Sequence, residues 1–237
     1  MRKVVFTNGH YYHVYNRGVE KRDIFMDEKD YFRFIHDLYE FNDRNHVLNL
    51  NFRFKSNYGA PSSIVLDSIV LEKKKERELL VEIICFCLMP NHFHLILKQL
   101  IDGGISLFMQ KLAGYVYYFN LKYQRIGPLF QGKFKAIEID NENYLLHLSR
   151  YIHLNPLELI EPDWKEKGIR NWQKAIKFLE SYRWSSYLDY LGIKNFPSLI
   201  QRDLINNYFK NPADYKNFII NFLPKDFNKI KDLLIEK

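Results

Sequence analysis

The sequence lacks a long apolar segment. No hydrophobic run approaches the roughly eighteen residues that a membrane-spanning helix requires. The N-terminal stretch, MRKVV, has no signal-peptide core. Internal repeats and low-complexity tracts are absent as well. These absences argue against a membrane-embedded, secreted or repeat protein, and we expect a soluble, cytoplasmic protein without a membrane partner.

Cysteine is scarce. The two cysteines, Cys85 and Cys87, stand two positions apart in a predicted strand. The strand holds the two thiols apart, so they cannot form an ordinary disulfide with each other. A second cysteine pair, which a zinc site would usually use, is missing. We interpret both side chains as small buried hydrophobes in a reducing compartment.

Acidic residues are outnumbered. The chain has 28 Asp and Glu against 35 Lys and Arg, which gives a net charge of +7 and a pI near 9.1. This balance favours a polyanionic partner such as nucleic acid. A hydrophobic content of 47% indicates a folded chain. The 17 Tyr and 19 Phe mostly serve the core, and some are available to stack on unpaired bases.

The stretch 85–97 predicts a strand, a tight turn and a second strand. Residues 81–88 are apolar and rich in β-formers, and Pro90 and Asn91 supply the turn. His92 and His94 are two apart, so both project from one face of the second strand. Such a pair can hold one divalent metal ion, or can be two polar residues on a half-exposed strand. The opposite face carries Phe93, Leu95 and Leu97.

Apolar periodicity predicts a helix over 105–123 and another over 144–153. On the second helix, His147, Tyr151 and Asn155 follow at intervals of four and share one face. Pro156 ends this helix. We therefore expect Asn155 at the helix edge, with its amide directed outward.

The element order predicts an α+β fold, an antiparallel sheet with helices on one face. Within this fold, apolar and polar residues alternate over 48–55, which predicts a half-buried strand. We divide the chain into a domain over 1–190, with an insertion at about 56–80, and a helical C-terminal extension over 191–237.

Five sequence blocks carry a family resemblance. They are Tyr12–Gly18 (YHVYNRG), Leu88–His94 (LMPNHFH), Leu129–Phe134 (LFQGKF), Tyr151–Pro156 (YIHLNP) and Arg183–Tyr187 (RWSSY). In these blocks, and in their order and spacing, the chain resembles the HUH-type single-tyrosine transposases. It is most similar to the REP-associated tyrosine transposases. The tail after about residue 190 takes no part in the resemblance.

The resemblance implies a ferredoxin-like sheet with the His-Phe-His motif on a central strand and the tyrosine helix beside it. By position, His92 and His94 match the two metal-binding histidines, and Tyr151 matches the nucleophile. Asn155 matches the third metal ligand. The insertion-sequence branch usually has glutamine there, so asparagine favours the REP-associated branch. The mixed nitrogen and oxygen ligands suit Mg²⁺ or Mn²⁺.

The implied activity is that of a transposase: nicking and joining of single-stranded DNA hairpins through a 5′-phosphotyrosine intermediate. A phenol needs help to attack a phosphodiester. His147, one turn before Tyr151, is a candidate helper, or else a packing or solvent-facing histidine. Gln131 is a second accessory candidate, because it can order its loop near the site.

DNA-binding residues are expected in two places. Asn16 and Arg17 belong to the N-terminal block of the resemblance. Arg125, Lys133 and Lys135 flank a glycine-containing loop, where they can hold phosphates or serve as ordinary surface charge.

Other functions stay open at this point. The protein can be a DNA-hairpin-binding protein without catalysis, or a metal phosphoesterase without a covalent step. It can also be an HUH replication initiator or relaxase, which often uses two tyrosines; Tyr144 precedes Tyr151 by seven residues. We expect a monomer or homodimer that acts at the nucleoid.

Overall fold

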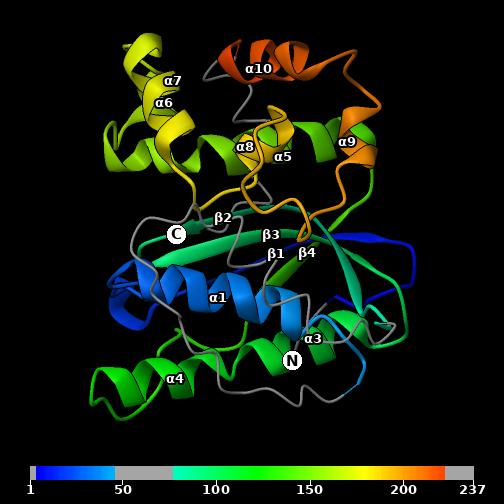
Figure 1. Ribbon diagram of the computed structural model, residues 1–237, viewed down its shortest axis with the longest axis vertical. Coiled ribbons are helices and arrows are strands. Elements are labelled where there is room, and N and C mark those ends of the chain that lie inside the picture. Colours follow the sequence, from blue (N-terminus) through cyan, green and yellow to red (C-terminus); the bar gives the residue numbers. More distant parts are fainter. Residues whose placement is uncertain (1–3, 46–76, 222–237) are drawn as a thin grey trace.

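Four strands pair into one antiparallel sheet in the computed structural model, which describes residues 4–45 and 77–221. The spatial order is β2-β3-β1-β4, so β1 and β3 are central (Figure 1). With a helix after β1 and helices between β3 and β4, this is the ferredoxin-like arrangement. The predicted α+β fold is confirmed. The strands are β1 (Tyr11–Arg17), β2 (Val81–Met89), β3 (His92–Gln99) and β4 (Lys135–Ile139).

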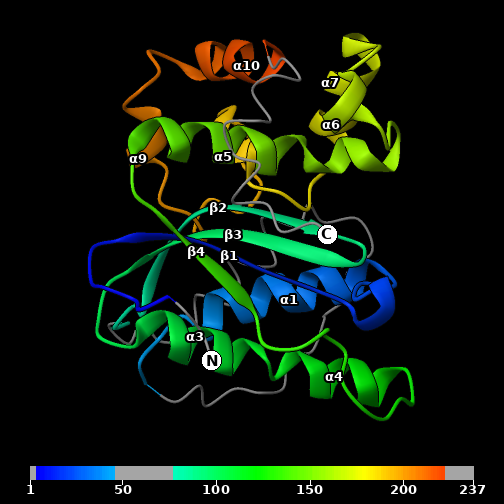
Figure 2. The same ribbon diagram turned by 180° about the vertical axis from the view of Figure 1, so that it is seen from behind.

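Helices cover both faces of the sheet, which corrects the expectation of helices on one face. α1, α3 and α4 lie on one side, and α5 lies on the other together with the later helices (Figures 1 and 2). The helical elements are η1 (Val19–Lys21), α1 (Glu28–Glu40), α3 (Gly104–Leu112), α4 (Tyr115–Lys122), α5 (Glu142–Leu154), η2 (Asn155–Leu159), α6 (Trp164–Lys167), α7 (Trp172–Ser181), α8 (Tyr187–Tyr190), α9 (Asp203–Asn206) and α10 (Pro212–Ile220).

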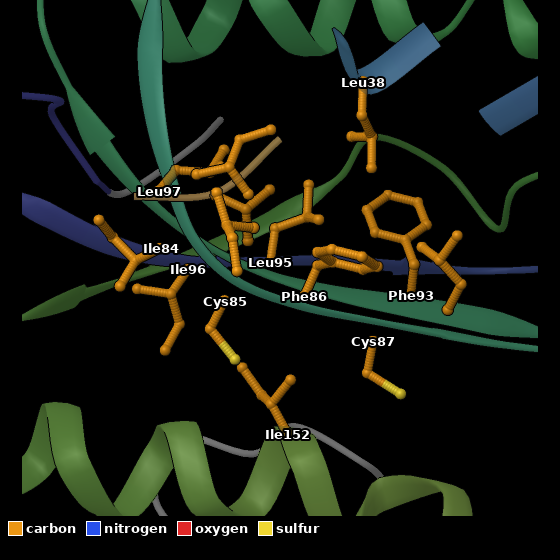
Figure 3. Packing of buried hydrophobic residues seen from close by; sticks show 14 of the residues in the cluster. Leu38, Ile84, Cys85, Phe86, Cys87, Phe93, Leu95, Ile96, Leu97 and Ile152 are labelled. Carbon is orange, nitrogen blue, oxygen red and sulfur yellow. The ribbon is translucent and has the colours of Figure 1, made fainter. Parts of the chain in front are cut away.

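The physical reason for two covered faces lies in β2. Its residues from Ile83 to Met89 are all buried, and a nearly continuous apolar strand is typical of burial on both faces. On one face of the sheet, Phe93 and Leu95 of β3 lie on the side of Leu38 of α1 (Figure 3). On the other face, Cys85 and Cys87 point toward α5 (Figure 3). Both are buried free thiols, which agrees with their interpretation as small buried hydrophobes.

Local sequence signals set the helix ends. Asn141 accepts a hydrogen bond at Oδ1 from the Tyr144 backbone N–H at 2.8 Å and so starts α5 close to the predicted boundary. The helix predicted over 105–123 is two helices, α3 and α4. They separate at Ala113 and Gly114, since glycine is a poor helix former.

The C-terminal segment packs on the outer side of α5. The guanidinium of Arg150 donates a hydrogen bond to the Phe218 carbonyl at 3.1 Å, and a bond of 2.6 Å joins His153 Nδ1 and the Tyr215 hydroxyl. α10 therefore shares the hydrophobic core with the sheet domain, and the proposed division at residue 190 stays a prediction. The predicted strand over 48–55, most of the insertion and residues 222–237 lie outside the described residues. In the part of the chain that is described, no helix has the length and apolar character of a membrane span.

Candidate functional site

The histidine pair lies on β3, beside the end of β1. His94 pairs with Tyr15 and His92 with Arg17 across the β1–β3 ladder, so all four side chains share one face. The two imidazole centroids are 5.0 Å apart. His94 is buried and His92 is half-buried. The strand thus holds two ring nitrogen donors close together on a rigid support.

Both histidines have a hydrogen bond at Nδ1. His92 Nδ1 donates to Asn91 Oδ1 at 2.6 Å, and His94 Nδ1 lies 2.9 Å from His13 Nε2. The bond to Asn91 leaves Nε2 of His92 for a metal, and the bond to His13 leaves Nε2 of His94 for a metal only where His94 is the donor. Burial lowers the pKa of His94 well below its usual value, and the electrostatic effect of His92, His13 and Lys165 lowers that pKa further. His94 is neutral at physiological pH, as a metal ligand must be.

Tyr151 lies on α5 and packs against the histidine pair of its own chain. Its ring centroid is 5.9 Å from that of His94, in an edge-on arrangement. Trp164 lies 6.1 Å away on the other side, and the ammonium of Lys165 is 5.3 Å from the ring centroid. The Tyr151 side chain is fully buried. One chain thus brings the predicted nucleophile to the predicted metal ligands.

Asn155 ends α5, one turn beyond Tyr151. It is fully buried, which corrects the expectation of an outward amide, because Pro156 turns the chain back over β2 through η2. Neither Oδ1 nor Nδ2 has a hydrogen-bond partner among the described residues. A buried amide without a hydrogen bond costs about 1–3 kcal/mol of folding free energy. The Asn155 oxygen is therefore suited to bind an additional partner.

The donor set fits a divalent cation. Among the described residues, no three His, Cys, Asp or Glu side chains form a group that could hold a metal ion, so a third protein ligand beside His92 and His94 has to be of another type. The Asn155 amide oxygen, one helical turn beyond Tyr151, is a candidate for that ligand, and two imidazoles with one amide oxygen suit Mn²⁺ or Mg²⁺.

A basic cleft of about 400 Å³ opens in front of the histidine pair. Four of its lining residues are cationic and one, Glu158, is anionic. Tyr151 and Asn155 do not line it. The lining residues are Tyr15, Asn16, Arg17, Lys21, Asn91, His92, His94, Gln131, Gly132, Lys133, Lys135 and Glu158.

The end of β1 and the following loop form one wall of the cleft. Asn16 Nδ2 donates to the Gly132 carbonyl at 3.0 Å. The Gln131 backbone N–H donates to the Arg17 carbonyl at 2.9 Å, and Arg17 Nε donates to Gln131 Oε1. These bonds join two predicted DNA-binding residues, Asn16 and Arg17, to the loop that carries Gln131 and Lys133.

Two predicted residues lie elsewhere. Arg125 donates to Asn120 Oδ1 at 3.0 Å, just after α4, and does not line the cleft. His147 Nδ1 lies 2.8 Å from a guanidinium nitrogen of Arg150, and its ring faces Phe218 of α10. Its position on the outer side of α5 matches the packing alternative for this histidine.

Four residues near the site have no role predicted from the sequence: His13, Lys21, Glu158 and Lys165. His13 follows from the alternation in β1 once the β1–β3 register is known. Lys165 and Glu158 join in an ion pair of 3.0 Å beside Tyr151, which only the fold after Pro156 brings about.

Lys21 enters the cleft from a strained turn. Glu20 and Lys21 have φ of 55° and 60°, two consecutive non-glycine residues in the left-handed region. Each such residue costs on the order of 1–3 kcal/mol, and such strain concentrates at functional sites. The Lys21 carbonyl accepts a hydrogen bond from Asn91 Nδ2 at 3.3 Å, which ties the turn to the histidine hairpin.

Glycine substitution separates the strain from the charge. Glu20→Gly and Lys21→Gly should each stabilise the fold by up to about 1 kcal/mol, because glycine adopts positive φ without a steric cost. Only Lys21→Gly should weaken DNA binding, since the Glu20 side chain is 81% exposed and lies outside the cleft. Thermal unfolding and a DNA titration check both effects. Equal DNA affinity in the two variants would show that Lys21 does not contribute to DNA binding.

The fold and the site define a ferredoxin-like protein in which a histidine pair, a helix-borne tyrosine and a basic cleft meet. Residues 46–155 match the family model described as "Transposase IS200 like", somewhat less than half of the chain. This match agrees with the resemblance found in the sequence: the central part of the chain is similar to the IS200-like transposases.

Among solved structures, one similar chain is described as "Structure of the REP associates tyrosine transposase bound to a REP hairpin". The similarity has a TM-score of 0.48 at 13% sequence identity and covers 86% of this chain and 92% of the other. No curated protein matches the chain.

Proposed function

We propose that the protein is a metal-dependent single-strand DNA endonuclease and strand transferase with Tyr151 as the nucleophile. The observation that carries the proposal is the 5.9 Å approach of the Tyr151 and His94 rings within one chain. The match to IS200-like transposases supports it. The test is whether a covalent adduct forms between the protein and labelled single-stranded DNA.

His92, His94 and Asn155 would hold Mg²⁺ or Mn²⁺, which polarises a phosphate oxygen when bound. The Tyr151 oxygen attacks phosphorus and loses its proton. The bond from phosphorus to the 3′ oxygen breaks, and that oxygen leaves as a hydroxyl. Lys165 lies beside the ring, where its charge favours the negative charge that develops on Tyr151.

The covalent bond between Tyr151 and the 5′ phosphate retains the energy of the broken bond. A second 3′ hydroxyl can therefore attack the phosphotyrosine and rejoin the strand without ATP. One protomer supplies nucleophile and ligands together, so a monomer suffices for the chemistry. Hairpin preference and action at the nucleoid follow from the sequence resemblance and belong to the same proposal.

A second candidate is a DNA-hairpin-binding protein without catalysis. The observation that favours it is the complete burial of Tyr151, which does not line the cleft. Strand transfer requires the DNA or the segment after Pro156 to move so that the hydroxyl reaches phosphorus. Adduct formation separates the two candidates.

DNA binding should depend on the cleft cations and not on Arg125. Replacing Lys133 or Lys135 with alanine should lower the slope of log K against log salt by about 0.7, the value for one phosphate contact on a single strand. Arg125→Ala should leave the slope unchanged, because Arg125 lies outside the cleft. Titrations of labelled single-stranded DNA at several salt concentrations measure this. A loss of slope in Arg125→Ala would extend the DNA path to the end of α4.

A further inference from the structure

The hydrogen bonds at Nδ1 differ between the two histidines of the pair. The partner of His92 is the amide oxygen of Asn91, which can only accept, so the proton on Nδ1 of His92 is fixed. The partner of His94 is Nε2 of His13, 2.9 Å away. An imidazole nitrogen can donate or accept, so this bond has two directions.

The two directions have opposite consequences for a metal. If His94 donates from Nδ1, its Nε2 carries the lone pair and is a ligand atom. If His13 donates from Nε2, His94 accepts at Nδ1 and its proton resides on Nε2, where it blocks a metal. The side chain that sets this direction therefore controls whether β3 offers two ligand nitrogens or one.

We infer that His13 is a positioning residue that accepts a hydrogen bond at Nε2 from His94 and so directs the Nε2 lone pair of His94 to the metal. The inference rests on the proposed function, which gives His94 a metal to bind. His13 is fully buried in the central strand β1. Its ring is nearly parallel to that of His94, with an interplanar angle of 20° and centroids 5.1 Å apart.

The surroundings of His13 support a fixed orientation. Its ring stacks on Tyr15 at 4.9 Å, and the Tyr15 ring lies 5.8 Å from His94. Three rings from two neighbouring strands thus form one layer next to Tyr151, and an imidazole in this layer has little freedom to rotate. Asn91 and His13 act in parallel: each holds Nδ1 of one histidine and leaves Nε2 for the ligand role.

Nitrogen-15 NMR of the metal-free protein tests the direction of the bond, because long-range proton–nitrogen spectra identify which ring nitrogen carries the proton. We expect His94 to be protonated at Nδ1. Mn²⁺ alone is then titrated into each variant and followed by electron paramagnetic resonance. His13→Phe should weaken Mn²⁺ binding about 10- to 100-fold. His13→Gln, which keeps a carbonyl acceptor, should restore most of the affinity.

His10→Gln is the matched control. His10 precedes the same strand, is exposed and bonds to Glu138 instead, so neither the His94 tautomer nor the affinity should change. A proton on Nε2 of His94, or unchanged Mn²⁺ affinity in a folded His13→Phe, would overturn the inference. If His13→Phe does not fold, the His94 tautomer of the wild-type protein and the Mn²⁺ affinity of His13→Gln test the inference. A third outcome is that the wild-type protein shows the expected His94 tautomer but binds no Mn²⁺. This result would overturn the metal site of the proposed function, and the positioning role of His13 would fall with it.

Discussion

Tyr151→Phe is expected to abolish the covalent protein–DNA adduct and to reduce strand cleavage by about 10⁴-fold or more, as loss of a nucleophile does. In the proposed mechanism the phenolic oxygen bonds to phosphorus, and phenylalanine keeps the ring that packs against His94 and Trp164. The fold should lose no more than about 1 kcal/mol with the hydroxyl. Labelled single-stranded DNA hairpins from the flanks of the gene, incubated with Mn²⁺ and resolved on denaturing gels, measure both products.

Tyr144→Phe is the control for this experiment. Tyr144 lies on α5 two turns before Tyr151, is buried, and does not line the cleft. Its loss should leave the adduct intact, whereas a two-tyrosine relaxase would lose a step. Cleavage that persists in Tyr151→Phe would instead identify a metal phosphoesterase. Tight hairpin binding with no adduct in the wild type would favour the binding protein.

Asn155→Leu should stabilise the metal-free protein and inactivate it. The Asn155 amide is buried without a hydrogen-bond partner among the described residues. An apolar side chain with the same branched shape therefore removes a cost of about 1–3 kcal/mol, which corresponds to a rise of several degrees in Tm for a chain of this size. If Asn155 is the third metal ligand, as proposed, cleavage should fall about 10²-fold or more. Thermal unfolding in EDTA and the adduct assay provide the two measurements.

Asn195→Leu supplies the opposite case. The Asn195 amide is buried too, but donates to the carbonyls of Arg183 and Ser185 at 2.7 and 3.1 Å. Its replacement should destabilise the protein, since two carbonyls lose their partner. If Asn155→Leu lowers the Tm as Asn195→Leu does, the Asn155 amide has a structural bond and the argument for a ligand fails.

Local chemistry explains what the sequence predicted well. The alternation that puts His92 and His94 on one face, the turn at Pro90, and the cap before α5 each depend on neighbours within a few residues. The same holds for the interval between Tyr151 and Asn155. The burial of β2 on both faces was also encoded in its unbroken apolar run, although the expected fold covered only one face.

Pairing across the sheet explains what the sequence did not predict. His13 meets His94 because β1 and β3 are neighbours in a fixed register, 81 residues apart in the chain. Lys165 reaches Tyr151 because the chain folds back after Pro156. Neither relation leaves a periodic signal. The burial of Asn155 was not predicted, because helix geometry gives the direction of a side chain but not which elements pack beyond the helix end.

The shared helix face of Tyr151 and Asn155 also limits how this protein can change in length. One residue added or removed between them would rotate Asn155 by about 100° around α5 and shift it by about 1.5 Å. The amide would then leave the face on which Tyr151 meets His94. Side chains on α5 can be exchanged one at a time, but an insertion or deletion between Tyr151 and Asn155 would separate the two side chains of the proposed site at once.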